Sequence, residues 1–193
     1  MLRYLTKKNL SLISLVALFN IATINAQSLD FELKTSPDVI FDFNTIQKYT
    51  NGITVMNACE LNIRAVGVEW DLYVGATTTN IGFWDISAQY SNSGADPPID
   101  IMQLQFRNSS NTSIVPGFFT IQDIGTPTYI IGSSADDAAV NCPAQGTNTP
   151  GDYQTSPGCY KFRVDIKITP GLNPIYKSGT YTLRIDYRLV EDL

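Results

Sequence analysis

The sequence predicts an all-β protein, an antiparallel β-sandwich of about seven to ten strands. Three observations lead to this prediction. Apolar and polar residues alternate along many short segments, as they do in strands buried on one face. No segment of useful length shows the i, i+3, i+4 apolar spacing of an amphipathic helix. The intervening turns are rich in Gly, Pro, Asn and Ser.

Short alternating segments fill the first two thirds of the chain. Each carries apolar residues at every second position, so that one face would pack inward. Gly67 separates two of these segments and is expected to mark a bulge or bend. The expected strands are Leu29–Leu33, Val39–Phe43, Ile53–Val55, Cys59–Ala65, Val68–Val74, Ile101–Phe106, Phe118–Ile121 and Tyr129–Ile131.

The clearest alternation lies near the C-terminus. In Tyr160–Ile168, apolar residues at 162, 164, 166 and 168 share one face, and charged residues at 161, 163, 165 and 167 share the other. The pattern resumes in Thr180–Val190 after a connection with two prolines and two glycines. Because consecutive amphipathic strands commonly form a meander, we expect these two to pair antiparallel.

Residues 1–26 resemble a secretory signal peptide. Arg3, Lys7 and Lys8 precede the apolar run Leu10–Ile24, and Ala26 offers a small residue for cleavage. The alternative is an N-terminal membrane anchor, but Asn20 and the short run argue against a stable span. Residues 27–193 would then form one β-sandwich domain, secreted, periplasmic or at the cell surface, with no membrane insertion after cleavage.

The expected mature chain is acidic. The 10 Lys and Arg left after residue 26 stand against 18 Asp and Glu, which gives a net charge of −8. Such a chain with no basic run repels nucleic acid and anionic membranes, so neither is an expected partner.

The side chains needed for common catalytic sites are missing. The chain has no histidine, which excludes Ser-His-Asp triads, Cys-His pairs and His-ligated metals. The sequence therefore predicts no catalytic residues, and the protein is expected not to be an enzyme.

Three cysteines remain for an oxidising compartment. Cys142 and Cys159 flank a loop of 16 residues with three prolines and three glycines, and a disulfide between them would contribute about 3 kcal/mol. Cys59 would then be a small buried core residue, because it alternates with Leu61 and Ile63. The alternative is that Cys59 pairs with one of the other two.

A carboxylate pair is the one candidate for hydrolytic chemistry. Glu69 and Asp71 lie two residues apart on an expected strand, so both should project from its outer face about 7 Å apart. That spacing suits an inverting glycoside hydrolase, whereas the simpler interpretation is two solvated carboxylates on an open sheet face. Trp70 between them is expected in the core.

Two further candidates concern ligands rather than catalysis. Asp96 with Asp100, and Asp136 with Asp137, lie in expected loops that could hold a structural calcium ion, although no known calcium-loop spacing is present. No other cofactor is expected. Trp84, beside Phe83, is the aromatic residue singled out as a contact for a glycan.

Two stretches carry a resemblance to known families. Ser178–Ile185 (SGTYTLRI) looks like the closing strand of chaperone-usher fimbrial subunits and the related spore-coat-U-like proteins of bacteria, and Trp70-Asp71-Leu72 is similar to tryptophan motifs in bacterial wall-associated sandwiches. The resemblance covers a minority of the chain. It implies an immunoglobulin-like or pilin-like sandwich that assembles by donating an N-terminal strand. The expected late disulfide departs from fimbrial subunits, which typically carry an early one.

Leu29, Phe31 and Leu33 are the residues on which strand donation would depend. An added strand gains backbone hydrogen bonds and fills alternate pockets, but the same segment can also pair inside its own domain. The leading expectation is therefore an exported structural or adhesion protein that contacts other surface proteins or copies of itself. The alternatives are a carbohydrate-binding module and, behind it, the carboxylate hydrolase.

Overall fold

The computed structural model describes residues 27–35, 38–115, 117–133, 148–172 and 175–192. The expected signal peptide, Cys142 and the Asp136–Asp137 pair lie outside these residues. The described chain is predominantly β, and all pairings between its strands are antiparallel. The predicted fold class is confirmed.

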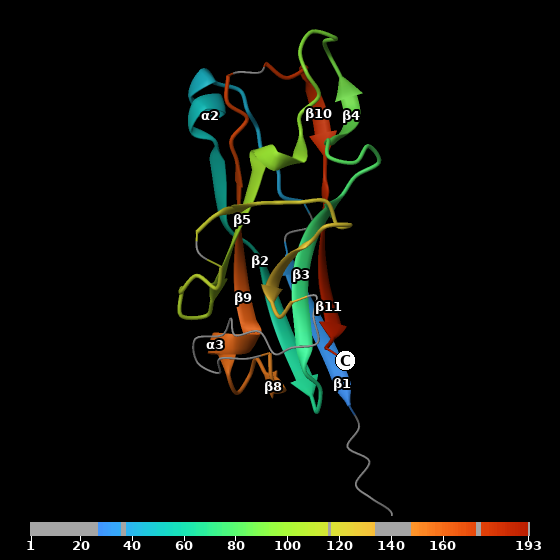
Figure 1. The fold of residues 1–193 in the computed structure, drawn as a ribbon. Coiled ribbons are helices and arrows are strands. Elements are labelled where there is room, and N and C mark those ends of the chain that lie inside the picture. Colours follow the sequence, from blue (N-terminus) through green and yellow to red (C-terminus); the bar gives the residue numbers. More distant parts are fainter. Residues whose placement is uncertain (1–26, 36–37, 116, 134–147, 173–174, 193) are drawn as a thin grey trace, which may run out of the picture.

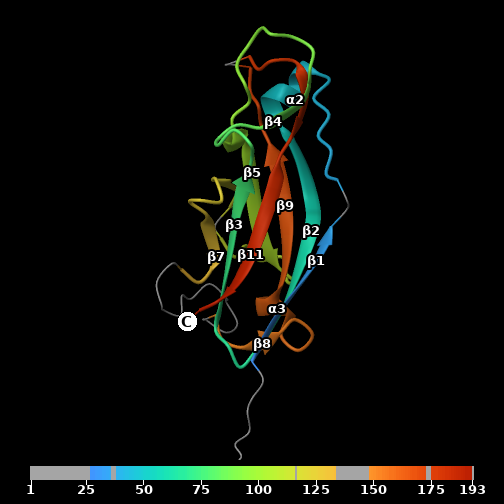
Figure 2. The same cartoon turned by 90° about the vertical axis from the view of Figure 1, so that its right-hand side faces the viewer.

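Two sheets face each other across one hydrophobic core (Figures 1 and 2). The larger sheet has the order β1-β2-β9-β5-β6, with β8 paired to β2, and the smaller has the order β11-β3-β7. Their bounds are β1 Ser28–Thr35, β2 Ile53–Val66, β9 Lys161–Ile168, β5 Met102–Asn108, β6 Phe119–Thr120, β8 Gly151–Asp152, β11 Arg184–Glu191, β3 Trp70–Thr77 and β7 Thr128–Ile131.

A third, two-stranded sheet extends one end of the sandwich (Figure 1). It pairs β4 (Asp85–Gln89) with β10 (Gly179–Thr182), and α2 (Ile46–Asn51) lies at the same end. We call this end the tip. The opposite end, where β1 begins and β11 ends, is the base, and α3 (Pro157–Tyr160) lies near it. A single turn of 3-10 helix, η1 (Ile99–Ile101), precedes β5.

The core consists of the inward residues of the two sheets. Alternation places them on one side of each strand, which is why the period-two pattern located them correctly. Trp70 is 1% exposed, as predicted, and packs on Tyr160 with ring centroids 5.7 Å apart. Other apolar residues at 1% exposure or less are Leu61, Ile63, Leu72, Val74, Ala76, Leu104, Phe106, Ile121, Ile130, Ile131, Phe162 and Val164.

The expected pairing of the two C-terminal strands is wrong. β9 lies between β2 and β5 in the larger sheet, whereas β11 pairs with β3 in the smaller one. Between them the chain passes through β10 at the tip and crosses to the other sheet. Alternation specifies which face of a strand is buried, but it does not specify which strand lies beside it. The apolar faces of β9 and β11 are both buried because they pack against the same core from opposite sheets.

Two other strand predictions change in detail. The segments Ile53–Val55 and Cys59–Ala65 belong to one long strand, β2, interrupted by a register shift at which Asn57 has φ 51°. The segment Val39–Phe43 is not a strand. Its odd-numbered residues still pack against the core, while Ile40 is 81% exposed. The alternating pattern therefore arises because one side of this segment is buried, although the segment has no sheet partner.

The N-terminal strand pairs inside its own chain. β1 lies antiparallel to β2 from Ser28 opposite Val66 to Thr35 opposite Cys59. Leu29 and Phe31 are half-buried against the core, whereas Leu33 is 42% exposed. β1 therefore forms the edge of its own larger sheet.

Candidate functional site

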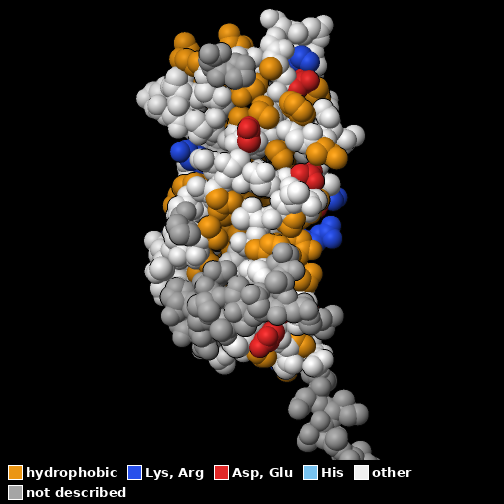
Figure 3. Space-filling view, viewed as in Figure 1, with side chains coloured by type: hydrophobic (Ala, Val, Ile, Leu, Met, Phe, Trp, Pro, Cys, Tyr) orange, Lys and Arg blue, Asp and Glu red, His pale blue; other side chains and the backbone are white. Residues whose placement is uncertain are grey.

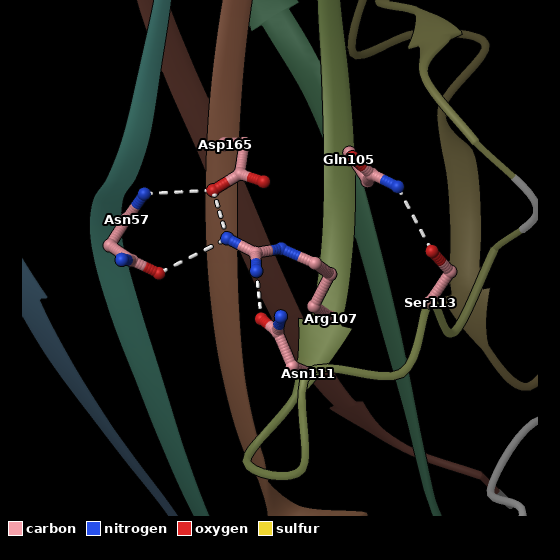
Figure 4. A network of polar contacts seen from close by, with 6 residues as sticks. All are labelled: Asn57, Gln105, Arg107, Asn111, Ser113 and Asp165. Atoms are coloured by element: carbon pink, nitrogen blue, oxygen red, sulfur yellow. Dashed lines mark hydrogen bonds and ion pairs between the residues drawn. The ribbon is translucent and has the colours of Figure 1, made fainter.

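The most buried charged cluster lies on the outer face of the larger sheet (Figure 4). Asp165 of β9 is 0% exposed, and its Oδ1 accepts hydrogen bonds from Arg107 Nη2 of β5 at 2.6 Å and from the Asn57 backbone N–H at 2.8 Å. Arg107 Nη2 also donates to Asn57 Oδ1 at 3.2 Å, and Nη1 donates to Asn111 Oδ1. One ion pair thus joins β2, β5 and β9.

This cluster explains the irregular backbone around it. Asn57 and Asn111 are the two non-glycine residues of the described chain with positive φ, and both place their side chains on Arg107. A left-handed conformation costs free energy for a residue with a Cβ, and the hydrogen bonds to the buried guanidinium offset that cost. Asp165 and Arg107 are shielded from solvent, whereas Asn57 and Asn111 are exposed at the edge of the cluster. Because the buried ion pair holds the irregular part of β2 in place, its geometry suits a structural role rather than contact with a substrate.

A shallow groove of about 300 Å³ lies at the tip beside Trp84. Its lining combines aromatic, aliphatic and acidic side chains: Thr79, Asn80, Phe83, Trp84, Asp85, Ile86 and Asp96. Trp84 is half-buried and packs partly on the core, while its Nε1 is buried without a hydrogen-bond partner among the described residues. The predicted ligand contact therefore lines a groove.

The acids of the groove are positioned by local contacts. Asp85 Oδ1 accepts the Thr79 backbone N–H at 2.8 Å, which fixes the turn leading into β4. Asp96 Oδ1 lies 2.8 Å from Lys177 Nζ, so that carboxylate is partly neutralised by a lysine on the approach to β10. Phe83 and Ile86 are 38% and 46% exposed and form an apolar part of the rim.

The tip as a whole exposes several large apolar side chains. They lie on α2, on β4 and its flanks, and on the connection between β9 and β10, and apolar side chains reach the surface at this end in Figure 3. Strongly exposed examples are Ile46 at 73%, Ile81 at 72%, Tyr90 at 71%, Ile175 at 74% and Leu172 at 51%. Scattered single apolar residues are normal on a surface, but a group at one end is a feature of contact surfaces.

The candidate pair Glu69 and Asp71 does not form an open carboxylate site. Glu69 is exposed in the turn before β3, whereas Asp71 is only 5% exposed. Gly132, at φ 79°, passes so close over Asp71 that a Cβ there would overlap its carboxylate. Both the catalytic interpretation and that of two solvated carboxylates placed Asp71 on an open face, and neither anticipated the chain that covers it.

The predicted calcium ligands Asp96 and Asp100 have different surroundings. Asp96 pairs with Lys177, and Asp100 lies exposed in η1. The other proposed pair, Asp136 and Asp137, lies outside the described residues. Among the residues that the structure describes, no three Asp, Glu or Cys side chains gather in a metal-binding group.

Cys59 is a free, buried cysteine in the described chain, as the alternation predicted. Its Sγ donates to the Tyr187 hydroxyl at 3.3 Å. Burial raises the pKa of the thiol to about 11, although the hydrogen bond with Tyr187 acts in the opposite direction. Cys159 is disulfide-bonded. Because Cys142 lies outside the described residues, its pairing with Cys159 stays a prediction.

Comparison with known proteins adds no family to this description. No family model matches the chain, and no curated protein is significantly similar to it. Within the described ranges, the structure contains no helix that is long and apolar enough to span a membrane.

Proposed function

We propose that this chain is an exported surface protein without enzymatic activity, of the structural or adhesive class, which acts through protein contacts made by its tip. Export is supported by the signal-like residues 1–26, and the non-enzymatic role by a sequence without histidine. The fimbria-like resemblance of Ser178–Ile185 agrees with this class, since that stretch includes β10 and the start of β11.

The observation that carries the proposal is the exposed apolar tip. Ile46, Tyr90 and Ile175 each expose more than two thirds of their surface, and they come from three segments that are distant in sequence. Burying such side chains against a partner contributes about 25 cal/mol per Å² of apolar area removed from water. The first described strand begins and the last one ends at the base, so the tip points away from both (Figures 1 and 2).

Tip contact is favoured over strand donation because β1 is already paired. Donating β1 to a second molecule would break eight residue pairings with β2 and expose Leu29 and Phe31. The tip, in contrast, can meet a partner without any rearrangement of the sheets. A second copy of this chain is the partner we propose first.

The test is sedimentation velocity of residues 27–193 over a wide concentration range. We expect the wild-type protein to self-associate and an Ile86→Ser, Tyr90→Ser variant to stay monomeric. Val66→Ser is the matched control, because Val66 is 40% exposed at the base end of β2 and should leave association unchanged. Equal association of all three proteins would show that the tip is not the contact surface.

A glycan-binding role is the second candidate, and the Trp84 groove is the observation that favours it. Sugars present an apolar face that stacks on aromatic rings and hydroxyls that donate to carboxylates and amides. The groove offers Trp84 and Phe83 for the first, and Asp85, Asp96 and Asn80 for the second.

A glycan array probed with the wild type and with Asn80→Ala tests this role. Asn80 is exposed and belongs to the groove without contributing to the core, so the variant should fold normally. Glycan binding that Asn80→Ala weakens, with Val66→Ser unaffected, would support the role. An array without any bound glycan would count against it.

A further inference from the structure

We propose that the groove beside Trp84 selects glycans by charge, with Asp85 as the residue that determines the selectivity. A sugar that carries a protonated amine binds more tightly than a neutral sugar, and a sugar that carries a carboxylate binds most weakly. Such selectivity rests on the glycan-binding role proposed for the same groove and specifies the class of glycan that binds there.

The groove carries a net negative charge. Its lining includes two acidic side chains, Asp85 and Asp96, and, among the described residues, neither lysine nor arginine. Lys177 lies 2.8 Å from Asp96 Oδ1 and offsets that charge. Asp85 has no ion-pair partner in the described chain, and its one hydrogen bond comes from the neutral Thr79 backbone N–H. One uncompensated carboxylate therefore lines the groove.

Asp85 is held in place with one oxygen still available. The hydrogen bond from Thr79 N to Oδ1 is 2.8 Å long and orients the carboxylate, whereas Oδ2 makes no hydrogen bond or ion pair within the described ranges. An ammonium group has three N–H donors and no acceptor, so it can donate to this oxygen. A ligand carboxylate would instead meet a like charge.

The aromatic side chains of the groove give a second, independent reason to expect a cation. Trp84 and Phe83 both line it, and Phe83 is 38% exposed. The face of an aromatic ring carries partial negative charge and attracts a cation, and tryptophan does so most strongly. The same ring also stacks on the apolar face of a sugar. A sugar with an ammonium group uses both interactions, whereas a neutral or acidic sugar uses only the stacking.

The backbone keeps the aromatic pair beside the acidic one. Trp84 N donates to Pro97 O at 3.0 Å, and Ile99 N donates to Gly82 O at 2.9 Å. These two bonds join the turn that carries Trp84 to the segment that follows Asp96. A ligand would therefore meet a preformed site and lose little free energy in ordering it.

Tryptophan fluorescence of residues 27–193 tests this selectivity, because Trp70 is 1% exposed and a change on adding sugar therefore reports Trp84. The probes are tetramers of glucosamine, N-acetylglucosamine and galacturonic acid, used at a pH at which the glucosamine amines are protonated. We expect the glucosamine tetramer to bind most tightly and the galacturonic acid tetramer most weakly. Added salt should weaken binding of the glucosamine tetramer and leave that of the N-acetylated one unchanged, because ions screen exposed charges.

Asp85→Asn is the decisive variant. The new amide oxygen can still accept from Thr79 N, so the turn is preserved while the charge is removed. We expect this variant to bind the glucosamine tetramer about two- to fivefold more weakly, the effect of one exposed charge pair, and the N-acetylated tetramer unchanged.

Two further variants separate the charge of the groove from that of the whole protein. Lys177→Gln should strengthen binding of the glucosamine tetramer by a similar factor, because it removes the cation that competes for Asp96. Asp30→Asn is the matched control. Asp30 is exposed on β1, which begins at the base, so this variant loses the same charge away from the groove and should bind as the wild type does.

Equal affinity for the glucosamine and N-acetylated tetramers, or an Asp85→Asn variant that binds glucosamine as the wild type does, would overturn the charge selectivity and leave glycan binding intact. Equal affinity for Nα-acetyllysine amide and the glucosamine tetramer would overturn the assignment to a sugar, because the ammonium group alone would then account for binding. Failure of the glucosamine tetramer to bind would overturn the proposal as well, and the glycan array decides separately whether the glycan-binding role survives.

Discussion

Removing either member of the Arg107–Asp165 ion pair should destabilise the protein strongly. Asp165 is 0% exposed and its side chain accepts from Arg107 and from the Asn57 backbone. Arg107→Met leaves a buried carboxylate without its cation, and Asp165→Leu leaves a buried guanidinium without its anion. Each change should cost about 3–5 kcal/mol of the free energy of unfolding.

The double variant Arg107→Met, Asp165→Leu should be more stable than either single variant. It removes both charges together, and replacing a buried ion pair by apolar residues of similar volume is often close to neutral. The Asn57 backbone N–H would still lose its acceptor, which costs about 1–3 kcal/mol. We therefore expect a double-variant loss of about 1–3 kcal/mol, well below the sum of the two single losses.

Urea unfolding of the four proteins, with the slope and the midpoint fitted separately, measures these differences. Lys34→Met is the matched control, because the Lys34–Glu32 pair joins side chains that are 56% and 50% exposed and should contribute less than about 1 kcal/mol. Single losses no larger than that of Lys34→Met would show that the buried pair contributes no more than an exposed one. A double loss equal to the sum of the single ones would show that the two charges do not interact.

Three further predictions concern cysteines and one carboxylate. Because the pKa of the Cys59 thiol is about 11, a thiol reagent at pH 8 should react with it only after unfolding, and fast reaction of the native protein would contradict this. The free energy of unfolding should fall as the pH rises from about 9 to about 11, because in that range the thiol ionises only in the unfolded chain. Burial raises the pKa of Asp186, but the hydrogen bond from the Thr77 hydroxyl at 2.6 Å and the nearby arginines lower it further, so the ionised carboxylate stabilises the fold above the ordinary carboxyl pKa and this stabilisation is lost as the pH falls through the lowered pKa. Thr77→Val should raise the pKa of Asp186 in an NMR titration. An unchanged pKa would show that the hydroxyl is unimportant. A non-reducing peptide digest should recover Cys142 linked to Cys159, and Cys142→Ala with Cys159→Ala should cost about 3 kcal/mol, whereas a recovered link to Cys59 would contradict the pairing.

The buried faces of the strands could be predicted from the sequence, but the pairing between strands could not. Trp70 and the inward residues of Tyr160–Ile168 could be assigned because alternation reflects burial directly. The partner of β9 could not, because strands in two facing sheets have the same pattern as strands side by side. The segment Val39–Phe43 shows the same limit, since an extended chain alternates whether or not it has a sheet partner.

Sites on the outer faces were harder to predict than the core. Asp165 and Asp71 both alternate outward, yet both are buried because other parts of the chain cover them. Arg107 lies 58 residues from Asp165 and Asn148 lies 77 residues from Asp71, and no local pattern connects such pairs. Trp84 could be singled out by its chemistry, but the groove that it lines depends on Asp96 from the following loop.

Whether the tip makes protein contacts is best measured by sedimentation velocity of residues 27–193 beside the Ile86→Ser, Tyr90→Ser variant. We expect oligomers that grow with concentration for the wild type and for Val66→Ser, and a monomer at every concentration for the tip variant. A wild-type protein that remains monomeric throughout, or a tip variant that associates as the wild type does, would contradict this expectation.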